Sequence, residues 1–322
     1  MGKENPWQLA TGRWLGWRIL NAALVGTLLS WTETWWWLGD IATSLRPCFA
    51  AVLAAGCLVA WLRGRTGWAL VFGVLSLTYP LQVLPGNREL DPSPAESEKR
   101  EIKVFCHNVD KANRQSSAVL SEIRSISPDI AVLIEVDTWW ANQLQELEAN
   151  YPYHLVEARD GVFGMAIFSR RPLRESRIQD FSGYELPSVR VKFDVDGREV
   201  TLIGTHPPPP ANAFSFRIRN WHLGELAREA RLRESPLIVA GDFNCVPWSA
   251  AFRLFLKNSG LRKSGVSREV TWSPFRCPWL GFPVDYQLAS EEWRVVHSQI
   301  GTFLGSDHRW TLVEFQLTPN RR

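Results

Sequence analysis

Hydrophobic residues are distributed differently in the first quarter of the chain and in the remainder. Three apolar runs, at about residues 14–31, 48–62 and 68–84, contain very few charges. A helix needs about 20 residues to cross a bilayer, within a range of about 17–25. The second run is long enough only if it takes in residues from 38–45. The pattern therefore predicts a membrane anchor of three transmembrane helices in residues 1–86.

Aromatic and charged residues around these runs support the same interpretation and suggest an orientation. Nine of the 17 tryptophans precede Leu70, and tryptophan is enriched at membrane interfaces. Arg63 and Arg65 lie in the turn between the second and third runs, whereas Glu33 and Asp40 lie in the turn after the first. Because positive turns stay in the cytoplasm, three crossings place the rest of the chain on the outer side, in the periplasm or extracellular space.

A change of composition separates the anchor from the rest of the chain. Residues 87–100 are rich in proline and charge and contain almost nothing to bury. Such a segment is typical of a linker. We therefore expect three parts: the anchor at 1–86, the linker at 87–100 and a second domain at 101–322.

The second domain alternates short apolar runs with stretches of helical spacing. Runs of four to eight apolar residues indicate buried strands, and apolar residues three and four apart indicate helices. Strands are predicted at 102–106, 129–135, 162–169, 189–194, 200–204, 237–240, 283–288 and 293–300, with a last strand ending at Phe315, and helices at 115–125, 139–147, 214–233 and 250–257. This order predicts an α/β (α+β) fold.

Net charge and cysteine content say little about which function the chain has. The formal net charge of +3 is too small to indicate nucleic-acid binding by itself. The five cysteines show no metal-type spacing, so neither a zinc site nor a disulfide framework is indicated. We expect free thiols.

Polar residues at the ends of the predicted strands are the main chemical signal. Each one alone is also explained as a turn or capping residue. Together, at strand ends that meet at one edge, they form a set of oxygen ligands and histidines. Oxygen ligands without cysteine suit Mg²⁺ or Mn²⁺, and a histidine oriented by an aspartate can exchange a proton. The residues are Asn108, Glu135, His206, Asp242, Asn244, Asp285, Asp307 and His308.

Asp242 and Asn244 follow the apolar run 237–240 and Gly241, which we expect to allow a tight turn at the strand end. Residues two apart on extended backbone point to the same side, so both side chains can face one site. A local turn formed by the Asp and Asn side chains is the alternative.

The order and spacing of the set resemble the endonuclease/exonuclease/phosphatase superfamily, whose fold is similar to that of pancreatic deoxyribonuclease. The resemblance covers essentially all of residues 101–317, and membrane-anchored bacterial members are familiar. Its most specific motifs are Gly241-Asp242-Phe243-Asn244 and Gly305-Ser306-Asp307-His308. One departure is Ile134, where glutamine usually precedes the metal-binding glutamate. The other matching stretches are residues 105–109, 128–136, 164–170, 205–206 and 284–286.

The resemblance also implies a role for each residue of the set. Glu135 is implied as the principal metal ligand, Asn108 as a contact of metal and phosphate, and Asp307 as a neighbour of the metal. Asp242 is implied to position or deprotonate the attacking water, and Asn244 to orient it. His206 and His308 are implied to contact the phosphoryl oxygens, with Asp285 paired to His308.

The combined expectation is a four-layered α/β sandwich behind a membrane anchor in a bacterial inner membrane. Its implied activity is Mg²⁺- or Mn²⁺-dependent hydrolysis of a phosphodiester or phosphomonoester. The substrate is a nucleic acid or a phospholipid headgroup, which the fold does not distinguish. The alternative is a non-catalytic, membrane-tethered binding or scaffold module that has kept the fold.

Overall fold

The computed structural model describes residues 6–83, 90, 101–265 and 269–319. The chain divides into two compact units. The first holds the N-terminal helices together with the short segments Pro210–Ala213 and Trp248–Ala250, and the second holds the rest. Of the predicted linker at 87–100, only Leu90 is among the described residues.

The first unit is helical and has a small apolar core of its own. The predicted apolar runs lie in its first, third and last two helices. Ala23, Leu53 and Phe72 are buried at the centre of this core. Glu33 and Arg46 form an ion pair of 3.0 Å. The helices are α1 (Pro6–Ser30), α2 (Trp37–Ser44), α3 (Arg46–Leu62), α4 (Thr66–Ser76) and α5 (Thr78–Val83).

The three predicted membrane spans are not confirmed. Among the described residues, no helix by itself combines the length and the hydropathy that a bilayer crossing requires. Helices α2 and α3 meet both criteria as a pair, although the chain bends by 66° between them. The membrane anchor therefore stays a prediction.

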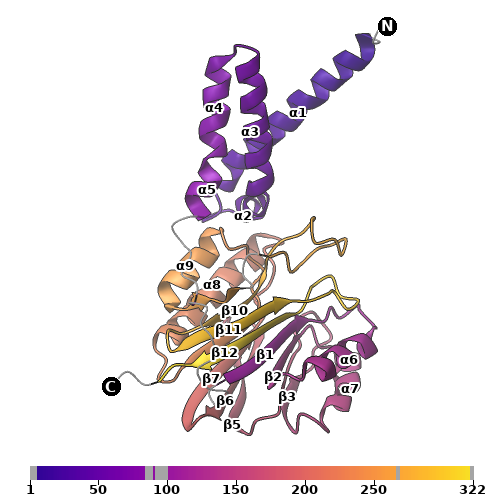
Figure 1. Ribbon diagram of the computed structural model, residues 1–322, viewed down its shortest axis with the longest axis vertical. Helices are drawn as coiled ribbons and strands as arrows, with labels where there is room; N and C mark the ends of the chain where they lie inside the picture. Colours follow the sequence, from indigo (N-terminus) through magenta and orange to yellow (C-terminus); the bar gives the residue numbers. More distant parts are fainter. Residues whose placement is uncertain (1–5, 84–89, 91–100, 266–268, 320–322) are drawn as a thin grey trace. The chain divides into compact units, whose positions relative to one another are not determined.

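The second unit contains two six-stranded mixed sheets (Figure 1). Within each sheet one neighbouring pair is parallel, β1 with β2 and β7 with β8, and the other pairs are antiparallel. Sheet one has the order β11 (Trp293–Ile300), β12 (Thr311–Leu317), β1 (Glu101–Asn108), β2 (Ile130–Ile134), β4 (Met165–Ser169) and β3 (Tyr153–Glu157). Sheet two has the order β5 (Leu173–Asp180), β6 (Pro187–Val195), β7 (Arg198–Thr205), β8 (Leu237–Asp242), β10 (Asp285–Ala289) and β9 (Arg262–Lys263).

Both faces of the central strands are covered, which explains their continuous apolar sequences. In β2, Ile130 and Val132 enter the core between the sheets, whereas Leu133 enters a second core with the helices. Successive side chains of a strand point to opposite faces, so every position of such a strand must be apolar. Ile238 and Val239 of β8 divide in the same way between the central core and a third core.

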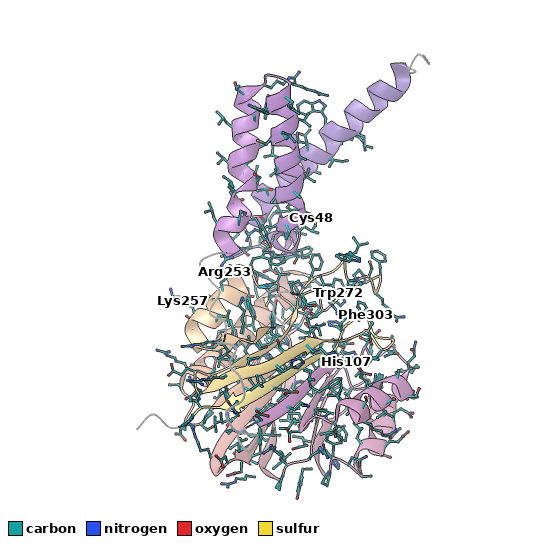
Figure 2. The ribbon with its side chains drawn as sticks, viewed as in Figure 1. Cys48, His107, Arg253, Lys257, Trp272 and Phe303 are labelled. Atoms are coloured by element: carbon teal, nitrogen blue, oxygen red, sulfur yellow. The ribbon has the colours of Figure 1, made fainter. Side chains whose placement is uncertain are left out.

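Helices complete the layers on the outer faces of the sheets. Buried residues of α6 (Ser116–Ile126) and α7 (Thr138–Leu144), followed by the 3₁₀ turn Gln145–Leu147, pack on sheet one. Buried residues of α8 (Ala213–Arg231) and α9 (Ala250–Ser259) pack on sheet two, whereas Lys257 of α9 is exposed on the outer side (Figure 2). The predicted α/β sandwich is confirmed, with two helical layers around two sheets.

Three strands were not predicted. The edge strand β5 is mostly exposed and carries alternating charges in Leu-Arg-Glu-Ser-Arg-Ile-Gln-Asp, so it lacks the apolar pattern that marks buried strands. Charged edge strands resist pairing with other chains. The other two are β3, which is only half buried, and β9, which has two residues.

Gly241 is required for a different reason than the turn we expected. It lies within β8, paired with Thr205 of β7 and Tyr286 of β10. A Cβ atom at this position would lie 1.9 Å from the carbonyl oxygen of Thr205. The glycine therefore allows β7 and β8 to approach closely where the polar residues begin.

Gly241→Ala should lower the free energy of unfolding by about 1–3 kcal/mol or more, the range typical of overpacking, since the clash is with backbone. Gly224→Ala is a matched control, because a Cβ atom there meets nothing within 4 Å on α8. That change should stabilise by roughly 0.5–1 kcal/mol. Urea unfolding of the full chain in detergent, followed by near-ultraviolet circular dichroism, measures both. Equal stability of the two variants would contradict the close approach.

Candidate active site

The predicted polar residues meet at one end of the sandwich, and both sheets contribute to the cluster. Sheet one supplies the C-terminal ends of β1 and β2 and the residues just before β12; sheet two supplies the ends of β7 and β8 and the start of β10. The strand register places these ends together, since Asp242 pairs with Asp285 and Cys106 pairs with Thr311. Hydrogen bonds and close charge pairs connect all eight residues: Asn108, Glu135, His206, Asp242, Asn244, Asp285, Asp307 and His308.

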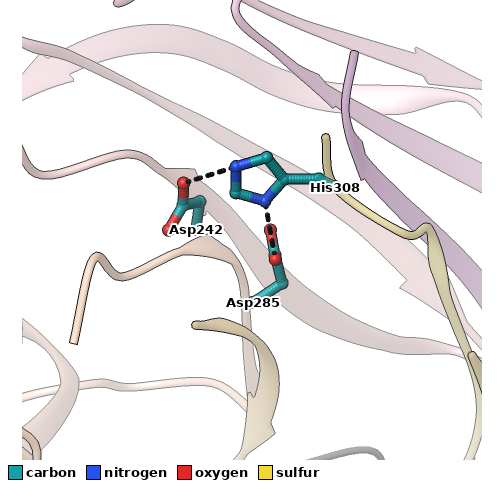
Figure 3. A group of neighbouring side chains, drawn as sticks. All are labelled: Asp242, Asp285 and His308. Carbon is teal, nitrogen blue, oxygen red and sulfur yellow. Dashed lines mark hydrogen bonds and ion pairs between the residues drawn. The ribbon is translucent and has the colours of Figure 1, made fainter. Parts of the chain in front are cut away.

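His308 and Asp285 form a buried pair that joins the sheets (Figure 3). The Nδ1 atom of His308 lies 2.9 Å from Oδ2 of Asp285, and the residues are 5% and 3% exposed. Burial alone lowers the pKa of the imidazole, but the charges of Asp285 and Asp242 outweigh it and raise the pKa of His308 to about 10. His308 is therefore an imidazolium at neutral pH, with Nδ1–H donating to Asp285.

Asp242 lies at the centre of the cluster and is 2% exposed. Its Oδ2 atom lies 3.6 Å from Nε2 of His308 and 3.5 Å from Nε2 of His206. Burial, and then the charge of Asp285, raise the pKa of Asp242 to about 6. A carboxylate with a raised pKa is a better proton acceptor than an ordinary aspartate.

The side chain of Asn244 reaches His206 from a turn and not, as we had expected, from extended backbone. Its φ of 48° is left-handed rather than extended, and its backbone N–H donates to Oδ1 of Asp242 at 2.9 Å. This is the local turn that the sequence left open. The turn directs Nδ2 of Asn244 to within 3.2 Å of Nε2 of His206 and 3.0 Å of the Pro207 carbonyl.

His206 is neutral. Burial lowers its pKa, because desolvation outweighs the attraction of Asp242. Its Nδ1 atom lies 3.1 Å from the carbonyl oxygen of Val162, so the proton is on Nδ1. The lone pair on Nε2 then accepts from the amide of Asn244.

Asn108 connects the glutamate to the rest of the cluster and is fully buried. Its Nδ2 atom lies 3.0 Å from Oε1 of Glu135, 3.3 Å from Oδ2 of Asp242 and 3.4 Å from Nε2 of His308. Ser306 holds this end of β1 in place: its hydroxyl donates to the Asn108 carbonyl at 2.8 Å and accepts from the His308 N–H at 2.9 Å.

Glu135 combines a buried charge with strained backbone. Its φ is 64°, a region that non-glycine residues rarely occupy. Burial raises the pKa of its carboxyl, although hydrogen bonds from Asn108 and the Lys111 backbone favour the charged form. Within the described part of the chain, Glu135 has no salt-bridge partner. Such strain and desolvation cluster at functional sites.

Asp307 lies at the rim, with its side chain 36% exposed. Its Oδ2 atom accepts from Nε1 of Trp272 at 2.7 Å, and Oδ1 lies 3.9 Å from Nε2 of His308. Trp272, which is stacked on Phe282, was not among the predicted residues, because a lone tryptophan between polar residues carries no strand-end signal. Thr271 was also missed; its hydroxyl accepts from the backbone N–H of Asp285 at 3.0 Å.

The donor set fits a hard divalent cation. Carboxylate and amide oxygens are the ligands that Mg²⁺ and Mn²⁺ prefer, and the uncompensated carboxylate of Glu135 gains most from a cation. Asp242, Asp285 and His308 also place ligand atoms within 4.8 Å of one another. The carboxylates of Glu135 and Asp307 and the amide of Asn108 are the other oxygen donors of the cluster.

Comparisons with known proteins identify a matching family and a shared fold. The sequence model of the Endonuclease/Exonuclease/phosphatase family matches residues 105–308. No curated protein sequence matches the chain.

Solved structures share the fold of the second unit. The catalytic domain of human Nocturnin with a bound sulfate anion is 20% identical, with a TM-score of 0.56, over 72% of this chain and 98% of that one. TDP2 from D. rerio, complexed with a single-strand DNA product, is 16% identical, with a TM-score of 0.56, over 67% and 99%. An endonuclease/exonuclease/phosphatase from Beutenbergia cavernae is 20% identical, with a TM-score of 0.55, over 68% and 72%.

Replacing Glu135 by glycine and by alanine separates the effect of backbone strain on stability from the effect of losing the side chain. Both variants lose the carboxylate, but only glycine occupies the left-handed region freely. Glu135→Gly should therefore be about 1 kcal/mol more stable than Glu135→Ala, after allowing for the greater freedom of unfolded glycine. Urea unfolding compares the two. An alanine variant at least as stable as the glycine variant would show that the backbone is unstrained.

Proposed function

The chain belongs to the endonuclease/exonuclease/phosphatase family, and we propose that it is a divalent-metal-dependent phosphoesterase that uses water to cleave a phosphate ester. The observation that carries this proposal is the connected cluster of Glu135, Asn108, Asp242 and the His308–Asp285 pair. A binding module has no need for a buried imidazolium, a raised aspartate pKa and a strained glutamate in one place. These features cost stability and are typical of catalytic sites.

Glu135, Asn108 and Asp307 are the residues proposed to hold the cation. When bound there, a divalent cation supplies positive charge that offsets the charge growing on the phosphoryl group. Asn108 has a second part in this arrangement. Because its amide donates to Glu135 at 3.0 Å and to Asp242 at 3.3 Å, it fixes the proposed metal ligand relative to the proposed base.

Asp242 is proposed to take the proton from the attacking water. Its raised pKa makes it a better base, and the backbone N–H of Asn244 fixes its orientation. The amides of Asn108 and Asn244 flank this point and can orient the water. His206 holds Asn244 from the other side.

His308 is proposed to stabilise the phosphoryl oxygens. As an imidazolium it keeps a proton on Nε2, which faces the carboxylate of Asp242. Preorganised donors aimed at developing negative charge are among the largest contributions to catalysis. Asp285 accepts a hydrogen bond from Nδ1 of His308 and so favours the ring with both nitrogens protonated.

Two classes of substrate remain in the proposal, nucleic acid and phospholipid headgroup. The D. rerio TDP2 structure holds a single-strand DNA product, which favours a nucleic acid. The proposed tether favours a lipid headgroup or extracellular nucleic acid. We further propose that the N-terminal helices anchor the chain in a bacterial inner membrane, with the catalytic unit outside the cytoplasm. The support is the bent α2–α3 pair and the apolar runs of α1, α4 and α5.

Glu135→Gln and Asp242→Asn should separate metal binding from chemistry. Glu135→Gln should weaken Mg²⁺ binding by about 10–100-fold or more, because a loss of that size is already typical when a residue that only supports a metal ligand is replaced. Calorimetry on the full chain measures the binding. Asp242→Asn should leave Mg²⁺ binding nearly unchanged and lower kcat by about 10²–10⁴. The substrate is the best of a panel of DNA, RNA, phospholipids and a phosphomonoester.

Glu146→Gln and Asp194→Asn are matched controls, since both side chains are exposed and neither belongs to the polar cluster. Wild-type turnover in both test variants would show that the assigned site is wrong. A wild-type chain without hydrolysis of any panel member would support the non-catalytic alternative.

His308→Ala should lower kcat by about 10²–10⁴, the contribution of a positioned proton donor. Asp285→Asn acts through the same imidazole, so the double variant should be little worse than His308→Ala alone. Steady-state kinetics of the two single variants and the double variant test this. Losses that multiply independently would show that the residues do not function as a pair.

Fusions after residue 88 test the proposed orientation. Alkaline phosphatase folds only after export and should be active there, whereas green fluorescent protein exported through the same route should stay dark. Replacing Arg63 and Arg65 with glutamate should give a mixture of membrane orientations, because the two arginine charges favour the cytoplasmic side. A bright fluorescent fusion with an inactive phosphatase fusion would place the catalytic unit in the cytoplasm.

A further inference from the structure

The helical unit contains an apolar cleft that the hydrolytic site does not use. It lies between α1, α3 and α4 and has a volume of about 620 Å³. In Figure 1, α1 diverges from the α3–α4 hairpin toward its N-terminal end. The volume falls within the range of about 300–1,000 Å³ typical of ligand pockets.

Small residues open this cleft, and aromatic residues line it. Gly16 on α1 and Ala55 and Gly56 on α3 are among its lining residues. Trp17 and Trp68, on opposite sides, remain 44% and 49% exposed. The ring of Trp68 is stacked on that of Phe72, with centroids 5.5 Å apart. This much exposed apolar surface in a concave site is typical of a site that binds an apolar group.

Two arginines stand at one end of the cleft. Arg63 and Arg65 line it and are exposed. Backbone hydrogen bonds hold the turn that carries them: Gly64 has a φ of 68°, and the Arg65 N–H donates to the Ala60 carbonyl at 2.9 Å. In the described part of the chain, neither guanidinium has an ion-pair or hydrogen-bond partner. Two unpaired positive charges therefore face the mouth of an apolar space.

The start of α4 adds to the attraction for an anion at the same place. No side chain caps this 11-residue helix at its N-terminus, so the first backbone N–H groups point outward without partners from a cap. The N-terminus of a helix favours negative charge. The turn thus combines two guanidinium groups and free helix donors next to Trp68.

We propose that the cleft binds one anionic phospholipid, with an acyl chain between α1 and α3 and the phosphate against Arg63 and Arg65. A free phosphate would leave the tryptophan-lined wall exposed, and a lipid without net charge would offset neither of the two positive charges. Basic pockets between membrane helices bind lipid headgroups in this way. The site belongs to the helical unit alone, so it does not depend on the proposed hydrolysis.

Native mass spectrometry of the full chain in dodecyl maltoside tests the proposal. The probes are palmitoyl-oleoyl phosphatidylglycerol, the matching phosphatidylcholine and inorganic phosphate. One phosphatidylglycerol should bind tightly, and Arg63→Gln with Arg65→Gln should weaken it roughly 30-fold, from about a fivefold effect per arginine near a headgroup. Arg217→Gln with Arg231→Gln, two exposed arginines of α8, removes the same charge and should change nothing.

A second pair of variants tests the acyl site without touching the charges. Ala55→Phe should fill the cleft and weaken both lipids, whereas Ala54→Phe, on an exposed position outside the lining, should not. Equal binding of the two lipids by the wild type would overturn the proposal, as would an unchanged affinity in the arginine variant. Inorganic phosphate that binds as tightly as phosphatidylglycerol would show that the acyl chain contributes nothing to binding.

Discussion

The hydrogen bond between His308 and Asp285 is the contact on which the site depends most, because it crosses from one sheet to the other. His308 precedes β12 in sheet one, and Asp285 begins β10 in sheet two. Removing one partner of a buried charged pair leaves an uncompensated charge, which costs about 3–5 kcal/mol. The pair therefore constrains how the two sheets meet at this end. Deeper in the sandwich, Gln287 makes a similar crossing by donating to the carbonyl oxygens of Val104 and Thr311.

The polar site begins where the apolar core between the sheets ends. Between the sheets the side chains are almost all apolar, and the packing ends where Gly241 brings β8 against Thr205. Beyond that point the strand ends carry charges that the fold must pair. His308 and Asp285 satisfy each other, and Asp242 shares its oxygens among several donors. Glu135 has no salt-bridge partner in the described part of the chain, and a bound cation would offset its buried charge.

Much of this could be predicted from the sequence, for a physical reason. Strands covered on both faces, such as Ile130–Ile134, must be apolar throughout, so they are visible as runs. Their ends are equally visible, because a run stops at Glu135 or Asp242. The edge strand Leu173–Asp180 was missed because exposure removes the pattern. The left-handed turn at Asn244 and the bond from Trp272 to Asp307 depend on long-range packing, which no local pattern records.

The most direct test of the hydrolytic site is the fate of the oxygen from water. The full chain with Mg²⁺ is incubated in ¹⁸O-labelled water with the best substrate, and the masses of the products are measured by mass spectrometry. Attack of water at phosphorus predicts one ¹⁸O atom in the phosphate product and none in the alcohol, with incorporation about 10²–10⁴-fold slower when Asp242 is replaced by asparagine. Label in the alcohol, or the same incorporation in that variant, would contradict the account.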